Sequence, residues 1–182
     1  MHKTIVVTPP RSEPVSLNEA KKQLRVTACN DDEHISNLIK VSRDRVEKFC
    51  NRFFTTQTVD IVYDSSLPDK YICLPYPDLE SVEQLSYYDS YGVEGVIPNT
   101  DYTFNSETQR ITASTSFPVD AISFRVRVVT GAPADFQGAK IAMLMTIADL
   151  FDLRVESVVG FSVSNNPAAG NNMWPYRVEL GV

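Results

Sequence analysis

Few residues in this chain belong to types that could do catalytic or metal chemistry. It has only two histidines, and the one with acidic neighbours is His34, which directly follows the acids at positions 31–33. An imidazole beside carboxylates has the composition of a zinc site. Adjacent residues at a helix start point in different directions, however, and the helix dipole favours acids at that place. We therefore interpret these acids as helix capping and predict no bound metal.

The short motifs of common enzymes are absent from the sequence. It has no GxGxxG or Walker loop and no HExxH pair, and residues 160–164 (GFSVS) lack the second glycine of a GxSxG elbow. The aspartates of the middle third do not have the spacing of an EF-hand calcium loop. We predict no catalytic residues and no cofactor, and hence that the chain is not an enzyme.

The acidic charge of the chain is concentrated in its middle third. Residues 57–121 hold two basic and eleven acidic residues, a net charge of −9, whereas residues 1–56 carry +3 and residues 122–182 carry zero. The simplest interpretation is an acidic surface that faces solvent or a lumen. Arg125 and Arg127 alternate along one predicted strand. We expect them to pair with carboxylates, within the chain or between subunits, in preference to phosphate.

Length, composition and cysteine usage fit one domain, or one domain with an insertion, made in the cytoplasm. The chain has 182 residues, of which 43% are hydrophobic, enough for a core. Its net charge of −6 argues against a protein that coats nucleic acid. Three cysteines without CxxC spacing predict free thiols. We expect no signal peptide, because Pro9 and Pro10 interrupt the first apolar run, and no membrane span.

Three stretches have the periodicity of helices. Residues 31–54 predict a long helix, capped by Asn30, because their apolar positions repeat at the spacing of one buried face: Ile35, Leu38, Ile39, Val46, Phe49, Cys50 and Phe53. Ser16 and Glu19 have capping-box spacing, which predicts a short helix over residues 17–25. The apolar residues 136–153 predict a third helix, buried by its neighbours or by other subunits.

The stretch between the second and third helices has the pattern of short strands separated by turns. Residues 122–128 alternate strictly between apolar and polar types, whereas residues 81–88 do not, so the faces of that strand stay open. Residues 1–15 predict an extended arm, since their three prolines exclude a helix. Several short strands at this spacing favour a small antiparallel or barrel-like unit.

These elements predict an α+β fold, a small α-helical bundle with an inserted antiparallel β unit and extended terminal arms. Two N-terminal helices and a long C-terminal helix form the bundle. The predicted organisation is an N-terminal arm and helical hairpin (1–56), the β unit (57–131), the C-terminal bundle helix (132–156), and a flexible tether with an aromatic tail (157–182).

The tail is abruptly aromatic after a Gly-, Asn- and Ser-rich stretch over residues 160–172. An aromatic cluster on a tether is expected to be pinned either to the core of its own chain or to a partner, and its residue types are those of interface hot spots. Both alternatives stay open at this point. The tail residues concerned are Met173, Trp174, Pro175, Tyr176, Arg177 and Val178.

In this order the pieces resemble the head–tail connector (adaptor) proteins of long-tailed bacteriophages. The most specific piece is SLNEAKKQLRV at residues 16–26, followed by the acids at 31–33. The opening VTPP (7–10), RVE (45–47), TQT (56–58), LP (74–75) with Val82, and the ending PYRV (175–178) follow in the same order. The match covers nearly the whole chain. One departure is that such proteins often carry a glycine near Asn51.

The resemblance implies a structural role in the virion neck. Such proteins form a ring, expected to be twelve-fold, beneath the portal protein, and they join the DNA-filled capsid to the stopper (tail-completion) protein and the tail. Genomic DNA passes their lumen without sequence-specific binding, and no membrane takes part. The chain would be made in the cytoplasm of the host bacterium. Very apolar helices fit such a ring, because a closed ring repeats one heterologous interface.

Three site hypotheses follow from the resemblance. Portal docking is assigned to the tail residues 173–178, and part of the acidic middle third is expected to face the DNA channel. An inter-subunit surface is assigned to the charged face of the long helix: Lys40, Arg43, Asp44, Glu47 and Lys48. Another tail or baseplate structural protein is the alternative, and a small metal-dependent enzyme is the least favoured class.

Overall fold

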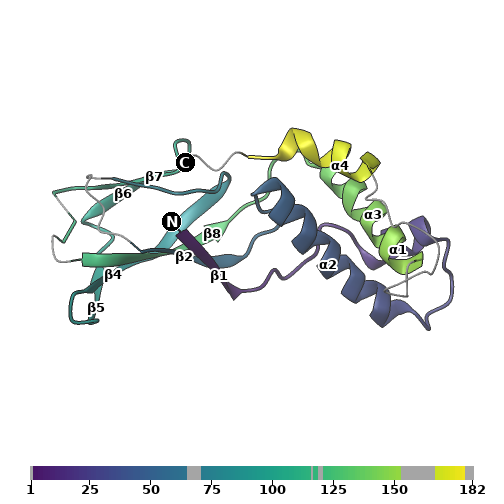
Figure 1. Ribbon diagram of the computed structural model, residues 1–182, viewed down its shortest axis with the longest axis horizontal. Coiled ribbons are helices and arrows are strands. Elements are labelled where there is room, and N and C mark those ends of the chain that lie inside the picture. Colours follow the sequence, from purple (N-terminus) through teal and green to yellow (C-terminus); the bar gives the residue numbers. More distant parts are fainter. Residues whose placement is uncertain (1, 65–70, 116, 119–120, 153–166, 179–182) are drawn as a thin grey trace. The chain divides into compact units, whose positions relative to one another are not determined.

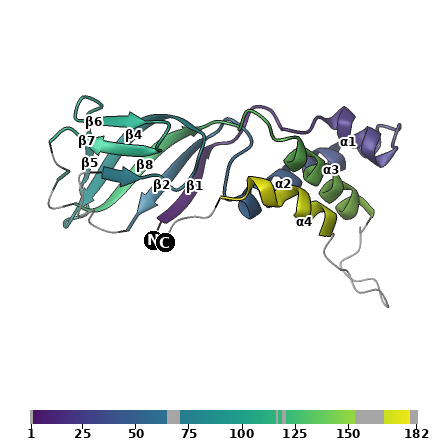
Figure 2. The same cartoon turned by 90° about the horizontal axis from the view of Figure 1, so that it is seen from above.

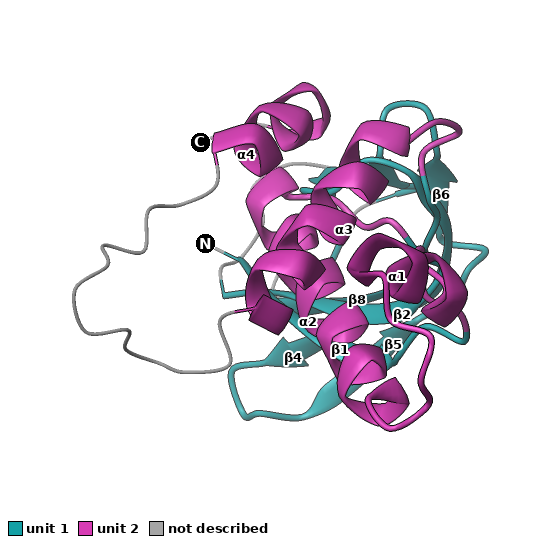
Figure 3. Ribbon diagram, turned by 90° about the vertical axis from the view of Figure 1, so that its right-hand side faces the viewer, with its two compact units in different colours: residues 1–11, 55–132, 180–182 teal, residues 12–54, 133–179 magenta. Residues whose placement is uncertain are grey.

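The computed structural model describes residues 2–64, 71–115, 117–118, 121–152 and 167–178. Over these residues it confirms the α+β class, with four α-helices and two antiparallel sheets (Figure 1). The chain divides into two compact units (Figure 3). We call residues 1–11, 55–132 and 180–182 the β unit, and residues 12–54 and 133–179 the helical unit.

The β unit contains both sheets. The larger has the order β1 (His2–Thr8), β2 (Thr58–Tyr63), β8 (Ala121–Thr130), β4 (Leu79–Asp89) and β5 (Glu94–Ile97). The smaller has the order β3 (Tyr71–Cys73), β7 (Arg110–Ala113) and β6 (Tyr102–Asn105). The smaller sheet lies over the larger one in both Figure 1 and Figure 2.

Strand β8 is the centre of the larger sheet and has the alternation that its sequence predicts. Phe124, Val126 and Val128 are buried, and the last two are register partners of Ile61 and Val59 on β2. Side chains of a strand alternate between its two faces, so these residues share one buried face. Each fully buried Val, Ile or Phe side chain stabilises the fold by about 1.5–3 kcal/mol.

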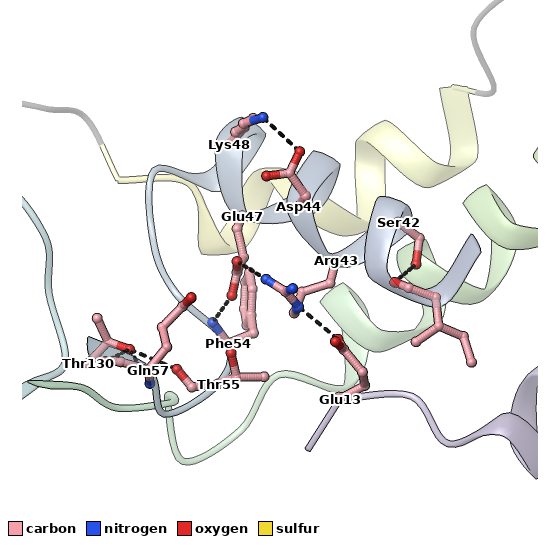
Figure 4. Close-up of polar contacts among 11 residues, drawn as sticks. Glu13, Ser42, Arg43, Asp44, Glu47, Lys48, Phe54, Thr55, Gln57 and Thr130 are labelled. Atoms are coloured by element: carbon pink, nitrogen blue, oxygen red, sulfur yellow. Dashed lines mark hydrogen bonds and ion pairs between the residues drawn. The ribbon is translucent and has the colours of Figure 1, made fainter. Parts of the chain in front are cut away.

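A threonine hydroxyl joins the end of β8 to the segment that leads into β2. The hydroxyl of Thr130, at the end of β8, donates to the carbonyl of Thr55 at 2.8 Å and accepts from the N–H of Gln57 at 3.0 Å (Figure 4). Thr130 is fully buried, so these bonds satisfy a hydroxyl that has no access to water.

The helical unit consists of α1 (Leu17–Leu24), α2 (Asp32–Cys50), α3 (Gln137–Asp152), α4 (Pro167–Met173) and the short 3₁₀ helix η1 (Trp174–Tyr176). Its core joins buried residues of α1 to α4, among them Ala20, Ile35, Val46, Met143 and Met173. Helix α3 contributes Ala139, Ala142, Met143 and Ile147 to this core. The neighbours that bury this apolar helix therefore include helices of its own chain.

The start of α1 agrees with the prediction from the sequence, and the start of α2 does not. The capping box of α1 is confirmed: the Ser16 hydroxyl accepts from the N–H of Glu19, and the Glu19 carboxylate accepts from the N–H of Ser16 at 2.9 Å. The expected Asn30 cap of α2 is wrong, because the helix begins at Asp32 and no side chain caps it. Asp32 instead pairs with Lys21 of α1 at 2.5 Å.

Two features of the predicted segments need correction. The first residues are not a separate arm of the helical segment, since β1 pairs with β2 from His2↔Tyr63 to Thr8↔Thr58 and belongs to the β unit. The predicted tether is not irregular throughout, because residues 167–173 form α4. Residues 153–166 lie outside the described part of the chain. A pattern within one segment does not show which distant segment it will pair with.

Candidate partner-binding surface

The aromatic tail lies on the helices of its own unit. Met173 is buried in the core of the helical unit, and the ring of Tyr176 makes an edge contact with Phe54 at 6.2 Å between centroids. The Tyr176 hydroxyl accepts the N–H of Gly138 at 3.2 Å. A Cβ at position 138 would lie 2.9 Å from the Tyr176 ring, so the close approach requires glycine there.

The end of the tail is hydrogen-bonded to the last turn of α2. The N–H of Val178 donates to the carbonyl of Cys50 at 2.8 Å, and the side-chain amide of Asn51 donates to the carbonyl of Val178 at 3.0 Å. Asn51 has the left-handed backbone (φ 51°) that ends α2, a conformation that glycine and asparagine adopt most readily. This explains why asparagine can stand near the place where the resembled family often has glycine.

Cys50 is an internal contact of this junction. Its Sγ donates to the carbonyl of Met173 at 3.6 Å, and its side chain is fully buried. Burial raises the pKa of the Cys50 thiol to about 11. The thiol is therefore protonated at neutral pH, and it is a packing group that lacks the thiolate character of a nucleophile.

The exposed tail residues Trp174, Pro175 and Arg177 form an aromatic patch together with the half-buried Phe49 of α2. We call these four residues the aromatic patch. The Trp174 side chain is 58% exposed and makes an edge contact with Phe49, with ring centroids 6.1 Å apart. The Arg177 guanidinium lies 5.1 Å from the Trp174 ring centroid and 5.4 Å from that of Phe49. Trp and Arg stacked at a surface are the residue types that dominate protein–protein binding energy.

A cavity of about 200 Å³ adjoins this patch, and helices α2, α3 and α4 line it. Phe49 and Met173 give it an apolar wall, while Arg45 and Asp149 bring opposite charges to it. A cavity of this size admits one side chain of a partner. The residues that line it are Arg45, Phe49, Thr146, Asp149, Ala169, Gly170 and Met173.

The structure thus separates the six predicted tail residues into two groups. Met173, Tyr176 and Val178 make contacts within the helical unit. Trp174, Pro175 and Arg177 are exposed. The first of the two open alternatives, docking on the chain's own core, holds for the first group, and the second group is available to a partner.

The charged face of α2 is divided in a similar way. Arg43 lies between two carboxylates, with its Nε 2.7 Å from Glu13 and its Nη1 2.9 Å from Glu47 (Figure 4). Glu47 is only 8% exposed, and its other oxygen accepts the N–H of Phe54 at 2.9 Å. Burial disfavours the charge of Arg43, but the two carboxylates outweigh it and raise the pKa of that guanidinium.

The remaining predicted inter-subunit residues lie on the surface. Lys40 is exposed, and Lys48 pairs with Asp44 one turn away at 2.7 Å, with both side chains more than half exposed. An exposed i,i+4 pair contributes about 0.3–0.5 kcal/mol to stability. Giving up this pair to form a contact with another subunit would therefore cost the fold little.

Both arginines of β8 pair with carboxylates inside the β unit, as expected. Arg127 makes two parallel hydrogen bonds to the Asp60 carboxylate, at 2.8 and 2.9 Å. Arg125 lies 3.7 Å from Glu94 and 5.2 Å from the ring centroid of Tyr88. Neither arginine is therefore presented as a separate phosphate site.

Among the described residues, no group of three His, Cys, Asp or Glu side chains could hold a metal ion. His34, the metal candidate of the sequence, lies with its ring 6.0 Å from that of Phe151. In the same part of the chain no helix combines the length and the apolar composition that a membrane crossing requires.

Sequence comparisons give no relative for this chain: no protein-family model matches it, and no curated protein matches it. Comparison of the fold does find similar structures. The architecture, an antiparallel β unit joined to a helical unit, is that of chains in the neck of a virus-like particle.

The particular structures come from a gene transfer agent (GTA). A chain of "Neck of empty GTA particle computed with C6 symmetry" has a TM-score of 0.72 at 15% identity, covering 99% of this chain and 97% of that one. A chain of "Virion of native gene transfer agent (GTA) particle" gives 0.73 at 15%, covering 98% and 97%. A chain of "Neck of native GTA particle computed with C12 symmetry" gives 0.70 at 14%, covering 100% and 97%. At these identities the likeness shows the fold.

Proposed function

We propose that this chain is a structural subunit of a virion neck, an adaptor whose copies form a ring between the portal protein and the stopper or tail. The observation that carries the proposal is the likeness of its whole fold, over both units, to chains of GTA necks. A likeness confined to one unit would fit a domain shared among unrelated functions. The sequence resemblance to phage connector proteins supports the same role independently of the fold.

The ring requires one heterologous interface repeated around an axis. The neck structures that this fold resembles were computed with six-fold and twelve-fold symmetry, and we propose a twelve-fold ring. On α2 the exposed residues Lys40, Asp44 and Lys48 would contribute to the contact between subunits, together with Val41, whose side chain is 51% exposed. Arg43 and Glu47 would support this surface from inside the chain.

Part of the acidic middle third would line the DNA channel. Like charge keeps a passing duplex from adhering to the wall, since phosphates are repelled by carboxylates. Exposed acids of the β unit available for this purpose are Glu80, Glu83, Asp101 and Glu107.

The aromatic patch is proposed as the surface that docks on the portal. Its exposed residues are held in place by the buried ones, so a partner would meet Trp174 and Arg177 already ordered. Truncation before the tail would not test this, because it would also remove Met173 and Tyr176 from the core of the helical unit. A substitution at the surface is needed.

Trp174→Ala tests portal docking without disturbing the core. We expect attachment to portal-bearing heads to weaken about tenfold or more, because an exposed hot-spot Trp contributes at least about 1.4–2 kcal/mol to binding. The measurement is the amount of variant retained on purified heads by sedimentation. Ile141→Ala, at a 45% exposed position of α3, is the control. Equal retention of both variants and of the wild type would rule out the aromatic patch as the docking surface.

Position in the particle separates the neck from the alternative of a tail-side or baseplate protein. An antibody against this chain, detected by electron microscopy on intact particles, is expected to bind at the junction of head and tail. Label at the far end of the tail would establish the alternative instead.

A further inference from the structure

The turn between β4 and β5 is a rigid projection of the β unit. We define residues 89–94 as the Tyr91 turn. One carboxylate oxygen of Asp89 accepts the N–H groups of Tyr91 and Val93, each at 2.9 Å. The N–H of Gly92 donates to the Asp89 carbonyl at 3.0 Å, and Gly92 has the left-handed backbone (φ +77°) that favours glycine. Side-chain and backbone bonds together therefore fix the shape of this turn.

This fixed turn displays apolar surface to water. The Tyr91 side chain is 90% exposed and that of Val93 is 62% exposed, while Asp89 and Glu94 place acidic groups on either side. An aromatic side chain on an ordered turn loses little conformational entropy when a partner covers it. Tyrosine is also among the residues that carry most of the binding energy at interfaces.

The helical unit has a groove of complementary character beside α1. Its volume is about 680 Å³, and the side chains of Leu17 and Val26 supply apolar surface. Lys22 and Arg25 are exposed at this groove, and neither has an ion-pair partner among the described residues. Lys21 is already paired with Asp32. The lining of this α1 groove is Leu17, Asn18, Lys21, Lys22, Arg25, Val26 and Thr27.

The basic side of the groove is ordered as well. Arg25 has a left-handed backbone (φ 56°), and its N–H donates to the carbonyls that end α1. The N–H of Val26 donates to the Lys21 carbonyl at 3.0 Å. These bonds fix the chain direction after the helix, so the groove does not have to be assembled when a partner arrives.

We propose that the Tyr91 turn of one copy docks in the α1 groove of the next copy. Tyr91 would cover the apolar surface of Leu17 and Val26. The carboxylate of Asp89, one oxygen of which fixes the turn, would face Lys22 and Arg25 together with that of Glu94, which also accepts from the Ser86 hydroxyl at 2.9 Å and lies 3.7 Å from Arg125. The two surfaces differ, so the contact is heterologous and can repeat around an axis. This inference rests on the proposed ring and assigns residues to its repeated contact.

Two complementary variants test the pairing, because each removes one side of the contact only. Tyr91→Ser removes the projection, and Lys22→Glu with Arg25→Glu reverses the charge of the groove. Analytical ultracentrifugation of the wild type is expected to show self-association that rises with concentration. Each variant alone should associate at least about tenfold more weakly. An equimolar mixture should form dimers and nothing larger, since one intact turn and one intact groove remain.

Val96→Ser is the matched control, since Val96 is a 60% exposed apolar residue of β5 outside the turn. It should associate as the wild type does. Circular dichroism should show the same fold for all variants. Tyr91→Ser protein that associates like the wild type would overturn the proposal.

Covalent cross-linking tests the same pairing when self-association is too weak to detect by sedimentation. Ser90→Cys and Asn18→Cys variants, each with Cys29→Ser and Cys73→Ser to remove the exposed native thiols, are mixed and treated with a short bismaleimide. Cross-linked dimers are expected in the mixture and not in either variant alone. Absence of these dimers in protein solution and in assembled particles would overturn the pairing, as would capture of a different protein by the Ser90→Cys chain. A neck location found in the same particles would leave the proposed function standing.

Discussion

The two units of this chain use their charges differently. In the helical unit, ion pairs join segments that are distant in sequence: Glu13 with Arg43, Lys21 with Asp32, and Glu19 with Lys140. In the β unit, the ion pairs of the described residues join strands of the larger sheet, as Asp60 of β2 does with Arg127 of β8, and many acids stay at the surface.

The charges of the helical unit therefore act mainly on its stability, whereas those of the β unit act mainly on its surface potential. The least exposed of these pairs, Glu13 with Arg43, holds segments of the helical unit together, so its loss is expected to be costly. The excess acid of the β unit contributes little to its own stability and sets the potential that a neighbour or a DNA duplex meets.

Among the variants that test this difference between the units, Glu47→Ala should lose the most stability. It removes a carboxylate that is 8% exposed and leaves the Arg43 guanidinium and the Phe54 N–H without that acceptor. We expect a loss of about 3 kcal/mol in the free energy of unfolding, measured by urea denaturation. Asp44→Ala, on the same helix but in an exposed pair, is the control and should cost less than about 0.5 kcal/mol. Equal losses for both variants would contradict a buried role for Glu47.

Asp60→Asn should have an intermediate effect, confined to the β unit. It keeps the size of the side chain and removes the charge that accepts both hydrogen bonds of Arg127. Arg127 remains 33% exposed and can recover water, so we expect a loss of about 1–2 kcal/mol. Hydrogen exchange of β2 and β8 amides measures it locally. A loss as large as that of Glu47→Ala would remove the distinction between the units.

Glu19 should give the smallest effect, and the pH dependence of that effect should appear only in acid. Its hydrogen bond with Lys140, followed by those with Ser16, lowers the pKa of this carboxyl from 4.5 to about 2. A lowered pKa in the folded state means stability that is present above the unfolded value and is lost as protons bind. The helical unit should therefore lose stability between pH 4.5 and about pH 2. Glu19→Gln should make the stability of this unit less dependent on pH over that interval. An unchanged dependence of stability on pH would contradict the assignment.

Much of the helical unit could be predicted from local patterns. The apolar spacing of residues 35–50 and the capping box at Ser16 both act within one or two helical turns, so the sequence alone expresses them. Strand β8 could be predicted equally well, because the alternation of apolar and polar residues in its sequence matches the alternation of burial in the structure.

Other features depend on contacts that no local pattern contains. Strand β4 has register shifts at three places, between Leu79 and Ser81, Val82 and Gln84, and Tyr88 and Asp89. The first two leave an extra residue in β4, Glu80 and Glu83, which changes the face that the next side chain occupies, so the period of two is lost from the sequence of β4. The pairing of β1 with β2 and the docking of Tyr176 on Gly138 join segments more than 35 residues apart.

For the candidate surface, the sequence predicts the tail as a whole but not its division into buried and exposed residues. The residue types of positions 173–178 are typical of interfaces, yet nothing in them shows that Met173 is buried while Trp174 is exposed. Gly92 marks residues 89–94 as a turn, but the sequence does not show the α1 groove, whose charge and apolar surface complement those of the turn.

The central claim, that this chain is a ring subunit of a virion neck, is tested most directly by electron cryomicroscopy of particles that contain it, reconstructed at the junction of head and tail. The fold described here should fit the density as a closed ring of identical copies between portal and tail, with both units of each copy accounted for. Density at that junction that does not accommodate this fold, together with density elsewhere in the particle that does, would contradict the claim.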